Sequence, residues 1–208
     1  MERLTIIPDD PDPRVIERAA DVLRAGGLVV FPTDTFYGLA ADPRNAQAVD
    51  RVFQAKGRPA TMALPLIAAD MDQVRVAAGP LSPLTITLAR AFWPGPLTLV
   101  ADASPSIVAG VHGGSRTIAI RVPDHVAARR LASCAGFPIV STSANRSGEP
   151  AVASADAAVA AIGDLVDLVL DAGTTPGAAA STIVDARGGV PLLVRAGAIP
   201  FPRVLEVS

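Results

Sequence analysis

The sequence has one cysteine, Cys134, among 208 residues. A single thiol forms neither an internal disulfide nor a cysteine-based metal cluster, which excludes disulfide-stapled domains and zinc fingers. Cys134 lies among alanines in a predicted helix, where we expect it to pack in the core. The two histidines, His112 and His125, have no acidic or cysteine partner at metal-ligand spacing, so no metal site is predicted. Low cysteine content fits a reducing cytoplasm, where we expect the protein to act.

Aromatic residues make up only 4% of the chain, and the formal net charge is -2. So few rings argue against a stacking platform for single-stranded nucleic acid, and the charge gives no overall attraction to nucleic acid. Half of the residues are hydrophobic, yet no run approaches the roughly 18 apolar residues of a membrane span. The segment 1–10 (MERLTIIPDD) has no basic region followed by an apolar stretch, so we expect no signal peptide and no membrane association.

Segments of strand type and helix type alternate along the chain without a repeated period. Helices are predicted at 84–92 and after the N-cap residues Asp12, Asn45, Asp70, Asp124 and Ser154. Strands are predicted at 28–31, 64–69, 97–102 and 117–123, and within 164–173, 181–186 and 191–197. The segment 137–145 is predicted to be a strand that runs into a polar loop. The stretches 112–115 and 173–180 are expected to be turn and loop. This pattern predicts one α/β domain spanning 1–208, with a twisted, open mixed sheet flanked by helices.

Polar side chains collect where the apolar strands end. The first strand runs into FPTDTFYGLAAD (31–42), whose paired threonines exceed what an ordinary turn needs. Lys56 and Arg58 stand two residues apart where a predicted helix ends. Later strands carry Arg121, Ser141, Thr142, Ser143, Asn145, Ser181, Thr182 and Arg195. Gathered at one edge of the sheet, these groups would line a positively charged cavity suited to a phosphate or carboxylate ligand.

The same residues also allow a purely structural interpretation. Lys56 and Arg58 would complement the dipole at a helix C-terminus, and the polar groups of 141–145 would satisfy local turns. Arg121 and Arg195 would be ordinary solvent-exposed side chains. No phosphate-binding loop ending in Gly-Lys-Ser/Thr and no Gly-x-Ser-x-Gly nucleophile elbow occurs in the sequence. The residues alone leave both interpretations open.

A set of motifs resembles, in order, those of the YrdC-type threonylcarbamoyl-AMP synthases in their short, single-domain form. They are PTDTFYGLAAD, KGRP, WPGPLTLV, TIAIRVP, STSANRSG, STIVD and LLVRAGAI. The resemblance covers residues 26–199 and implies a YrdC-like fold around a positively charged cavity. It also implies a nucleotidyltransferase reaction, in which L-threonine, bicarbonate or CO2, and ATP give L-threonylcarbamoyl-AMP and pyrophosphate. A separate tRNA transferase would use that product to make N6-threonylcarbamoyladenosine.

The resemblance further implies roles for individual residues. The family's Lys-x-Arg and Ser-x-Asn motifs give a catalytic set of Lys56, Arg58, Ser143 and Asn145. The implied ATP contacts are Arg58, Thr117, Ser143 and Arg195. The implied threonine contacts are Thr35, Arg121, Ser141 and Ser181, with the Arg121 guanidinium on the α-carboxylate. ATP is a substrate in this scheme, and Mg2+ is a candidate companion of its phosphates. No side chain stands out as a base for the threonine amine.

Three positions depart from the family pattern. Met62 stands where many relatives carry an asparagine that reaches the nucleotide. Ile67 replaces a histidine found near threonine in longer enzymes, and Ala151 replaces a frequent serine. These departures place single contacts in question and leave the four-residue catalytic set intact.

Two other functions share this fold. One is a non-catalytic YrdC-like protein that binds double-stranded RNA or assists ribosome assembly. Such relatives tend to lose the lysine or the asparagine of the catalytic set, and both remain here as Lys56 and Asn145. A basic cavity would still allow weak RNA binding. The other is a hydrogenase-maturation module, which is accompanied by acylphosphatase and zinc-binding segments that this sequence does not contain. The synthase is therefore the favoured interpretation.

Overall fold

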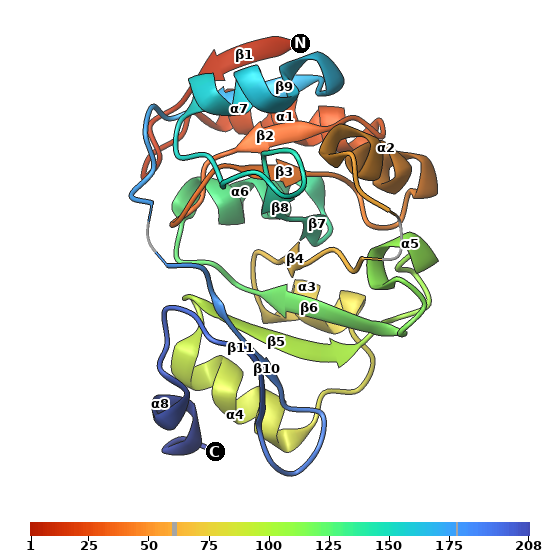
Figure 1. The fold of residues 1–208 in the computed structure, drawn as a ribbon, viewed down its shortest axis with the longest axis vertical. Coiled ribbons are helices and arrows are strands. Elements are labelled where there is room, and N and C mark those ends of the chain that lie inside the picture. The colour runs from red at the N-terminus through yellow and green to blue at the C-terminus, as the bar shows by residue number, and fades with distance from the viewer. Residues whose placement is uncertain (60–61, 178) are drawn as a thin grey trace.

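The computed structural model describes residues 1–59, 62–177 and 179–208 and contains two mixed β-sheets flanked by helices (Figure 1). The five-stranded sheet, in the upper half of Figure 1, has the order β1-β9-β2-β3-β8. The six-stranded sheet below it has the order β11-β10-β5-β6-β4-β7. The predicted α/β class and mixed pairing are confirmed, but the strands are divided between two sheets where the sequence predicted one.

The elements have the following bounds. The five-stranded sheet consists of β1 (Glu2–Thr5), β9 (Leu168–Asp171), β2 (Val29–Phe31), β3 (Gly38–Ala40) and β8 (Thr142–Ser143). The six-stranded sheet consists of β11 (Leu192–Arg195), β10 (Thr182–Asp185), β5 (Leu97–Asp102), β6 (Thr117–Arg121), β4 (Leu66–Ile67) and β7 (Ile139–Val140). The helices are α1 (Pro13–Arg24), α2 (Ala46–Lys56), α3 (Met71–Ala77), α4 (Pro83–Phe92), α5 (Ala109–His112), α6 (Val126–Ala135), α7 (Ala155–Ile162), the 3-10 turn η1 (Gly163–Leu165) and α8 (Phe201–Leu205).

Most helices begin where the sequence predicts. The side chains of Asp12, Asn45, Asp70 and Ser154 each accept a hydrogen bond from a backbone N–H of the following turn. The predicted cap of α6 is wrong, because His125 and not Asp124 is the N-cap residue. An imidazole nitrogen accepts a hydrogen bond as a carboxylate does, and His125 Nδ1 accepts from the backbone N–H of Ala128 at 3.3 Å.

The segment 137–145, predicted as one strand that runs into a polar loop, contains two short strands that belong to different sheets. β7 pairs with β4 in the six-stranded sheet, whereas β8 pairs with β3 in the five-stranded sheet. The chain therefore crosses from one sheet to the other at Ser141. This crossing brings the polar residues of the segment between the two sheets.

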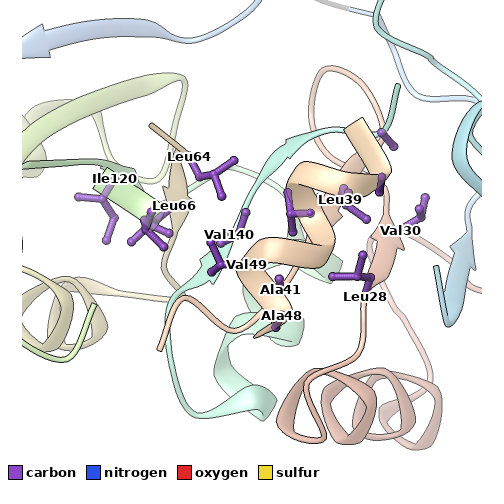
Figure 2. Packing of buried hydrophobic residues seen from close by; sticks show 14 of the residues in the cluster. Leu28, Val30, Leu39, Ala41, Ala48, Val49, Leu64, Leu66, Ile120 and Val140 are labelled. Atoms are coloured by element: carbon purple, nitrogen blue, oxygen red, sulfur yellow. The ribbon is translucent and has the colours of Figure 1, made fainter. Parts of the chain in front are cut away.

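The largest hydrophobic cluster joins both sheets. Figure 2 shows Leu28 and Leu39 of the five-stranded half and Leu66 and Ile120 of the six-stranded sheet within it, with Val49 of α2 between them. This shared core fixes the spacing of the two sheets because protein interiors are close-packed.

Two smaller clusters lie on the outer faces of the sheets. One packs α1 and α6 against β2 and β9, and the other packs α4 and α8 against β5 and β10. Cys134 on α6 is only partly buried at the edge of the first of these, so its prediction as a core residue is wrong. No helix in the described part of the chain is long and apolar enough to cross a membrane.

Candidate active site

A cavity of about 630 Å³ lies between the two sheets. Its walls come from β3 and β8 of one sheet and from β4, β5, β6, β10 and β11 of the other. The volume is in the range of small-molecule sites, about 300–1,000 Å³. Of the ten residues predicted from the sequence, eight line this cavity: Thr35, Arg58, Thr117, Arg121, Ser141, Ser143, Ser181 and Arg195.

Lys56 lies behind the cavity wall and not in its lining. The side chain is buried, and Nζ donates to the backbone oxygens of Ser143 at 2.6 Å and Asn145 at 2.8 Å. Gly57, directly after Lys56, ends α2 in the left-handed conformation, with φ 60°. Burial and the neighbouring Arg58 lower the pKa of Lys56 to about 8. Lys56 lies in the last turn of α2, as the helix-dipole interpretation expects, and it also holds the loop of the Ser-x-Asn motif.

Asn145 is also buried behind the wall. Its Nδ2 donates to the backbone oxygens of Arg146 at 2.9 Å and Glu149 at 2.7 Å. These bonds fix the orientation of the amide, because only its NH2 group can donate. Oδ1 is buried and has no hydrogen-bond partner among the described residues. The local-turn interpretation is thus confirmed for the nitrogen of Asn145.

Arg58 and Arg195 bring positive charge to the cavity, and neither pairs with a carboxylate in the described part of the chain. Arg58 donates to the backbone oxygen of Ala63 at 3.4 Å. Arg195 donates to the backbone oxygen of Ser181 at 2.7 Å and to its Oγ at 3.1 Å. Burial lowers the pKa of both guanidinium groups, and for Arg195 the charge of Arg121 lowers it further. Burial of a cation without a carboxylate partner is costly, and a bound anion would offset this cost for Arg58 and Arg195.

Arg121 is buried in β6 and forms a bidentate ion pair with Asp34. The distances are 3.0 Å from Nη1 to Oδ2 and 2.9 Å from Nη2 to Oδ1. The solvent-exposed interpretation of Arg121 is therefore wrong. Asp34 was not predicted as a site residue, although it lies between the two threonines of the PTDT motif.

The threonine-rich loop after β2 is tied down by its own hydroxyl groups. Thr33 Oγ1 donates to the backbone oxygen of Phe36 at 2.6 Å and accepts from the backbone N–H of Thr35 at 3.1 Å. The backbone oxygen of Thr35 accepts from Thr175 Oγ1 at 3.0 Å, and the buried Tyr37 donates its hydroxyl to Gly173 at 3.0 Å. Loop 173–177 thus supports the loop that carries Thr35 into the cavity.

Thr98 lines the cavity, although it was not predicted as a site residue. Its Oγ1 lies 2.8 Å from Ser181 Oγ, and both side chains line the cavity. The sequence feature that could have indicated Thr98 is its hydroxyl group inside the apolar strand 97–102.

Among the positions that depart from the family pattern, Ile67 and Ala151 line the cavity without adding a polar group. Met62 is half-exposed and lies outside the lining.

These features define an α/β protein with a cavity between two mixed sheets that Arg58, Arg121 and Arg195 help to line. A family model named Sua5/YciO/YrdC, described as "Telomere recombination", matches residues 21–197. The chain belongs to this Sua5/YciO/YrdC family. Among the described residues, no three His, Cys, Asp or Glu side chains come together in a group that could hold a metal ion.

Two relatives named threonylcarbamoyl-AMP synthase match most of this chain. The chain is 38% identical over 192 residues to the threonylcarbamoyl-AMP synthase of Pyrococcus abyssi, a match that covers 92% of this chain and 56% of that protein. It is 37% identical to the threonylcarbamoyl-AMP synthase of Chromobacterium violaceum, with 88% of this chain and 94% of that protein covered. The chain therefore spans little more than half of the first relative and nearly all of the second.

A solved structure shares the whole fold. The crystal structure of P. abyssi Sua5 complexed with L-threonine matches with a TM-score of 0.94 at 35% sequence identity. The match covers 100% of this chain and 61% of that one. This chain therefore shares its two-sheet arrangement with a relative that was crystallised in complex with L-threonine.

Proposed function

We propose that the protein is a threonylcarbamoyl-AMP synthase. Carboxylation of the L-threonine amine by bicarbonate or CO2 gives a carbamate, whose oxygen attacks the α-phosphorus of ATP and releases pyrophosphate. The observation that carries this proposal is the meeting of eight predicted residues in one cavity. They come from strands and loops of both sheets, from Thr35 after β2 to Arg195 at the end of β11.

The cations explain how this site would promote the reaction. The carbamate and the triphosphate are both anionic, so bringing them together requires charge neutralisation and alignment. Arg58 and Arg195 supply positive charge on the cavity wall, and Thr117 and Ser143 add hydroxyl groups there. Each charge-assisted hydrogen bond would contribute about 1.5–3 kcal/mol.

Lys56 and Asn145 have a different role in the proposed catalytic set. Lys56 Nζ bonds the two carbonyls that flank Ala144, so it positions Ser143 from behind the wall and does not itself clamp a phosphate. Asn145 shapes the same loop through its amide. Both act through Ser143, which lines the cavity.

The threonine subsite would lie near the Arg121–Asp34 pair. The hydroxyl groups of Thr35, Ser141 and Ser181 line the cavity with Arg121, whose guanidinium would bind the α-carboxylate. The P. abyssi relative was crystallised with L-threonine, which supports an amino acid as one substrate.

Mg2+ would enter as a complex with ATP, bound to the phosphates. The cavity lining offers hydroxyl groups and guanidinium groups in place of the carboxylate cluster that a resident Mg2+ ion prefers.

We further propose that residues 1–208 work as one domain in the cytoplasm and that a separate tRNA transferase consumes the product. Weak RNA binding at the cationic cavity remains an additional expectation, and it predicts that RNA competes with ATP.

The test is pyrophosphate release from purified protein supplied with ATP, L-threonine and bicarbonate. We expect pyrophosphate release to stop when threonine is omitted. We also expect added RNA to slow the release only by raising the apparent KM for ATP. Release that is independent of threonine would contradict the synthase. Tight binding of double-stranded RNA without any pyrophosphate release would favour the RNA-binding alternative.

A further inference from the structure

Thr98 of β5 and Ser181, directly before β10, lie side by side in the cavity wall. β5 and β10 pair in parallel with Thr182 opposite Leu97, and the backbone N–H of Thr182 donates to the backbone oxygen of Pro96 at 3.0 Å. This pairing brings Thr98 Oγ1 to 2.8 Å from Ser181 Oγ, and both residues line the cavity. The family motifs imply a role in threonine binding for Ser181 and none for Thr98.

Arg195 fixes the direction of one hydrogen bond at Ser181. A guanidinium group only donates, whereas a hydroxyl oxygen has two lone pairs and one hydrogen. Nη2 of Arg195 donates to Ser181 Oγ at 3.1 Å and to the backbone oxygen of Ser181 at 2.7 Å. One lone pair of Ser181 Oγ is therefore occupied, and the second lone pair and the hydrogen remain for Thr98 and for a ligand.

The burial of Thr98 fixes the direction of the second bond. Thr98 is only 3% exposed, and Ser181 Oγ is the one acceptor that its hydroxyl reaches among the described residues. A buried hydroxyl hydrogen without an acceptor is costly, so Thr98 donates and Ser181 accepts. Ser181 is half-buried, and since both of its lone pairs are occupied, its own O–H is the group that it presents to the cavity.

We propose that Thr98 is a positioning residue, which holds Ser181 as a pure hydrogen-bond donor to an anionic oxygen of the amino-acid substrate. This inference rests on the proposed function and deepens it, because it names the group that orients one hydroxyl of the threonine subsite. A serine hydroxyl with a free lone pair can accept from an ammonium group as well as donate to a carboxylate. With both lone pairs occupied, Ser181 binds only an acceptor, and the bonds from Arg195 and Thr98 strengthen its donation.

A double-mutant cycle measures whether Thr98 acts through Ser181. Calorimetry gives the Kd of L-threonine for wild type, Thr98→Val, Ser181→Ala and the double variant. Valine keeps the shape of threonine but has no hydroxyl, so we expect Thr98→Val to weaken threonine binding about three- to tenfold. In the Ser181→Ala background, the same change should alter the Kd by less than about twofold, because the residue through which Thr98 acts has lost its hydroxyl.

Two further variants separate this role from general packing. Thr98→Ser keeps the hydroxyl and should bind threonine within about twofold of wild type. Thr85→Val is the matched control, because Thr85 is also buried and its Oγ1 donates to the backbone oxygen of Ala186 at 3.1 Å, outside the cavity lining. It should leave the Kd of threonine unchanged. The Kd of ATP should be the same for wild type and Thr98→Val.

An unchanged Kd of threonine in Thr98→Val would refute the inference. An equal effect of Thr98→Val with and without the Ser181 hydroxyl would mean that Thr98 contacts the substrate itself. Thr98→Ser that binds as weakly as Thr98→Val would assign the effect to packing, and weaker ATP binding with unchanged threonine binding would place the hydroxyl pair at the nucleotide. Each of these results would also overturn the inference.

If Thr98→Val does not fold, Thr98→Ala removes the same hydroxyl, and the same cycle is measured with that variant. Wild-type protein that binds no threonine at all would refute the proposed function instead.

Discussion

The arginines of this chain differ in their partners. Surface arginines such as Arg3, Arg14 and Arg24 pair with aspartates or glutamates. Of the arginines that line the cavity, Arg121 pairs with Asp34, whereas no carboxylate among the described residues pairs with Arg58 or Arg195. A chain with a net charge of -2 therefore still presents two guanidinium groups without a carboxylate partner to the cavity. Overall charge governs long-range attraction, but a ligand in the cavity meets the local charges.

Replacing Arg58 with alanine should lower the rate of pyrophosphate release by about a hundredfold or more, the usual cost of losing one electrostatic donor at a reaction centre. Arg90→Ala removes the same charge from the exposed face of α4 and should leave the rate unchanged. Steady-state kinetics on the two variants checks this. Equal rates for both variants would remove Arg58 from the mechanism.

The lowered pKa of Lys56 predicts a specific pH dependence of stability. Between pH 8 and 10.5 the folded state releases the Lys56 proton while the unfolded state keeps it, so stability rises with pH in this window. Lys56→Met removes this titration. The free energy of unfolding of wild type minus that of Lys56→Met should therefore increase from pH 8 to pH 10.5, by at most about 3 kcal/mol.

Denaturant unfolding at several pH values measures this difference. A difference that stays constant across the window would show that the Lys56 ammonium has its ordinary pKa. The contacts of Lys56 with the Ser143 and Asn145 carbonyls would then offset the cost of its burial.

At the scale of elements, the end of β11 packs closely against the chain just before β10. A Cβ on Gly197 would lie 2.3 Å from the backbone oxygen of Ala180 and 2.5 Å from the backbone of Ser181. Only glycine allows this approach, which also brings Arg195 onto Ser181. The glycine of the LLVRAGAI motif therefore positions one wall of the cavity.

Gly197→Ala should push β11 away from Ser181, lower stability by about 1–3 kcal/mol and weaken ATP binding. Gly188→Ala is the matched control in the same hairpin, because a Cβ there has no neighbour within 4 Å. Thermal unfolding and calorimetric titration with ATP measure both effects. Unchanged ATP affinity in Gly197→Ala would show that the close contact of Gly197 with Ala180 and Ser181 does not shape the ATP-binding site.

The sequence predicted elements that carry local signals and missed those made by distant pairing. Capping residues such as Asn45 located helix starts because the cap bond is local. β3 (Gly38–Ala40) was missed because its three residues become a strand only by pairing with β2 and β8. Likewise, no local signal divides 137–145 between two sheets, or shows that Asp34 pairs with Arg121, 87 residues away.

At the scale of the whole molecule, the cavity is built from both sheets, so a bound ligand links them. The hydroxyl of Thr35 comes from the five-stranded half, whereas Arg121 and Ser181 belong to the other half. A ligand that binds only the folded arrangement stabilises it by mass action. Ligand binding and global stability are therefore coupled in this architecture.

L-Threonine at about 100 times its Kd should add about 2.7 kcal/mol to the free energy of unfolding, which is a rise of roughly 5–10 °C in Tm for a chain of this length. Arg121→Ala should abolish the rise. Arg129→Ala, which removes an α6 arginine paired with Asp124, should retain it. If threonine still raises the Tm of Arg121→Ala, the amino-acid subsite does not include Arg121.

The most direct test of the central claim is the fate of the bicarbonate carbon. Incubation with ATP, L-threonine and 13C-labelled bicarbonate, followed by mass spectrometry, should give labelled threonylcarbamoyl-AMP in a one-to-one ratio with pyrophosphate. The account predicts no labelled adenylate when threonine is omitted. Pyrophosphate release with an unlabelled adenylate, or no release with all three substrates present, would contradict it.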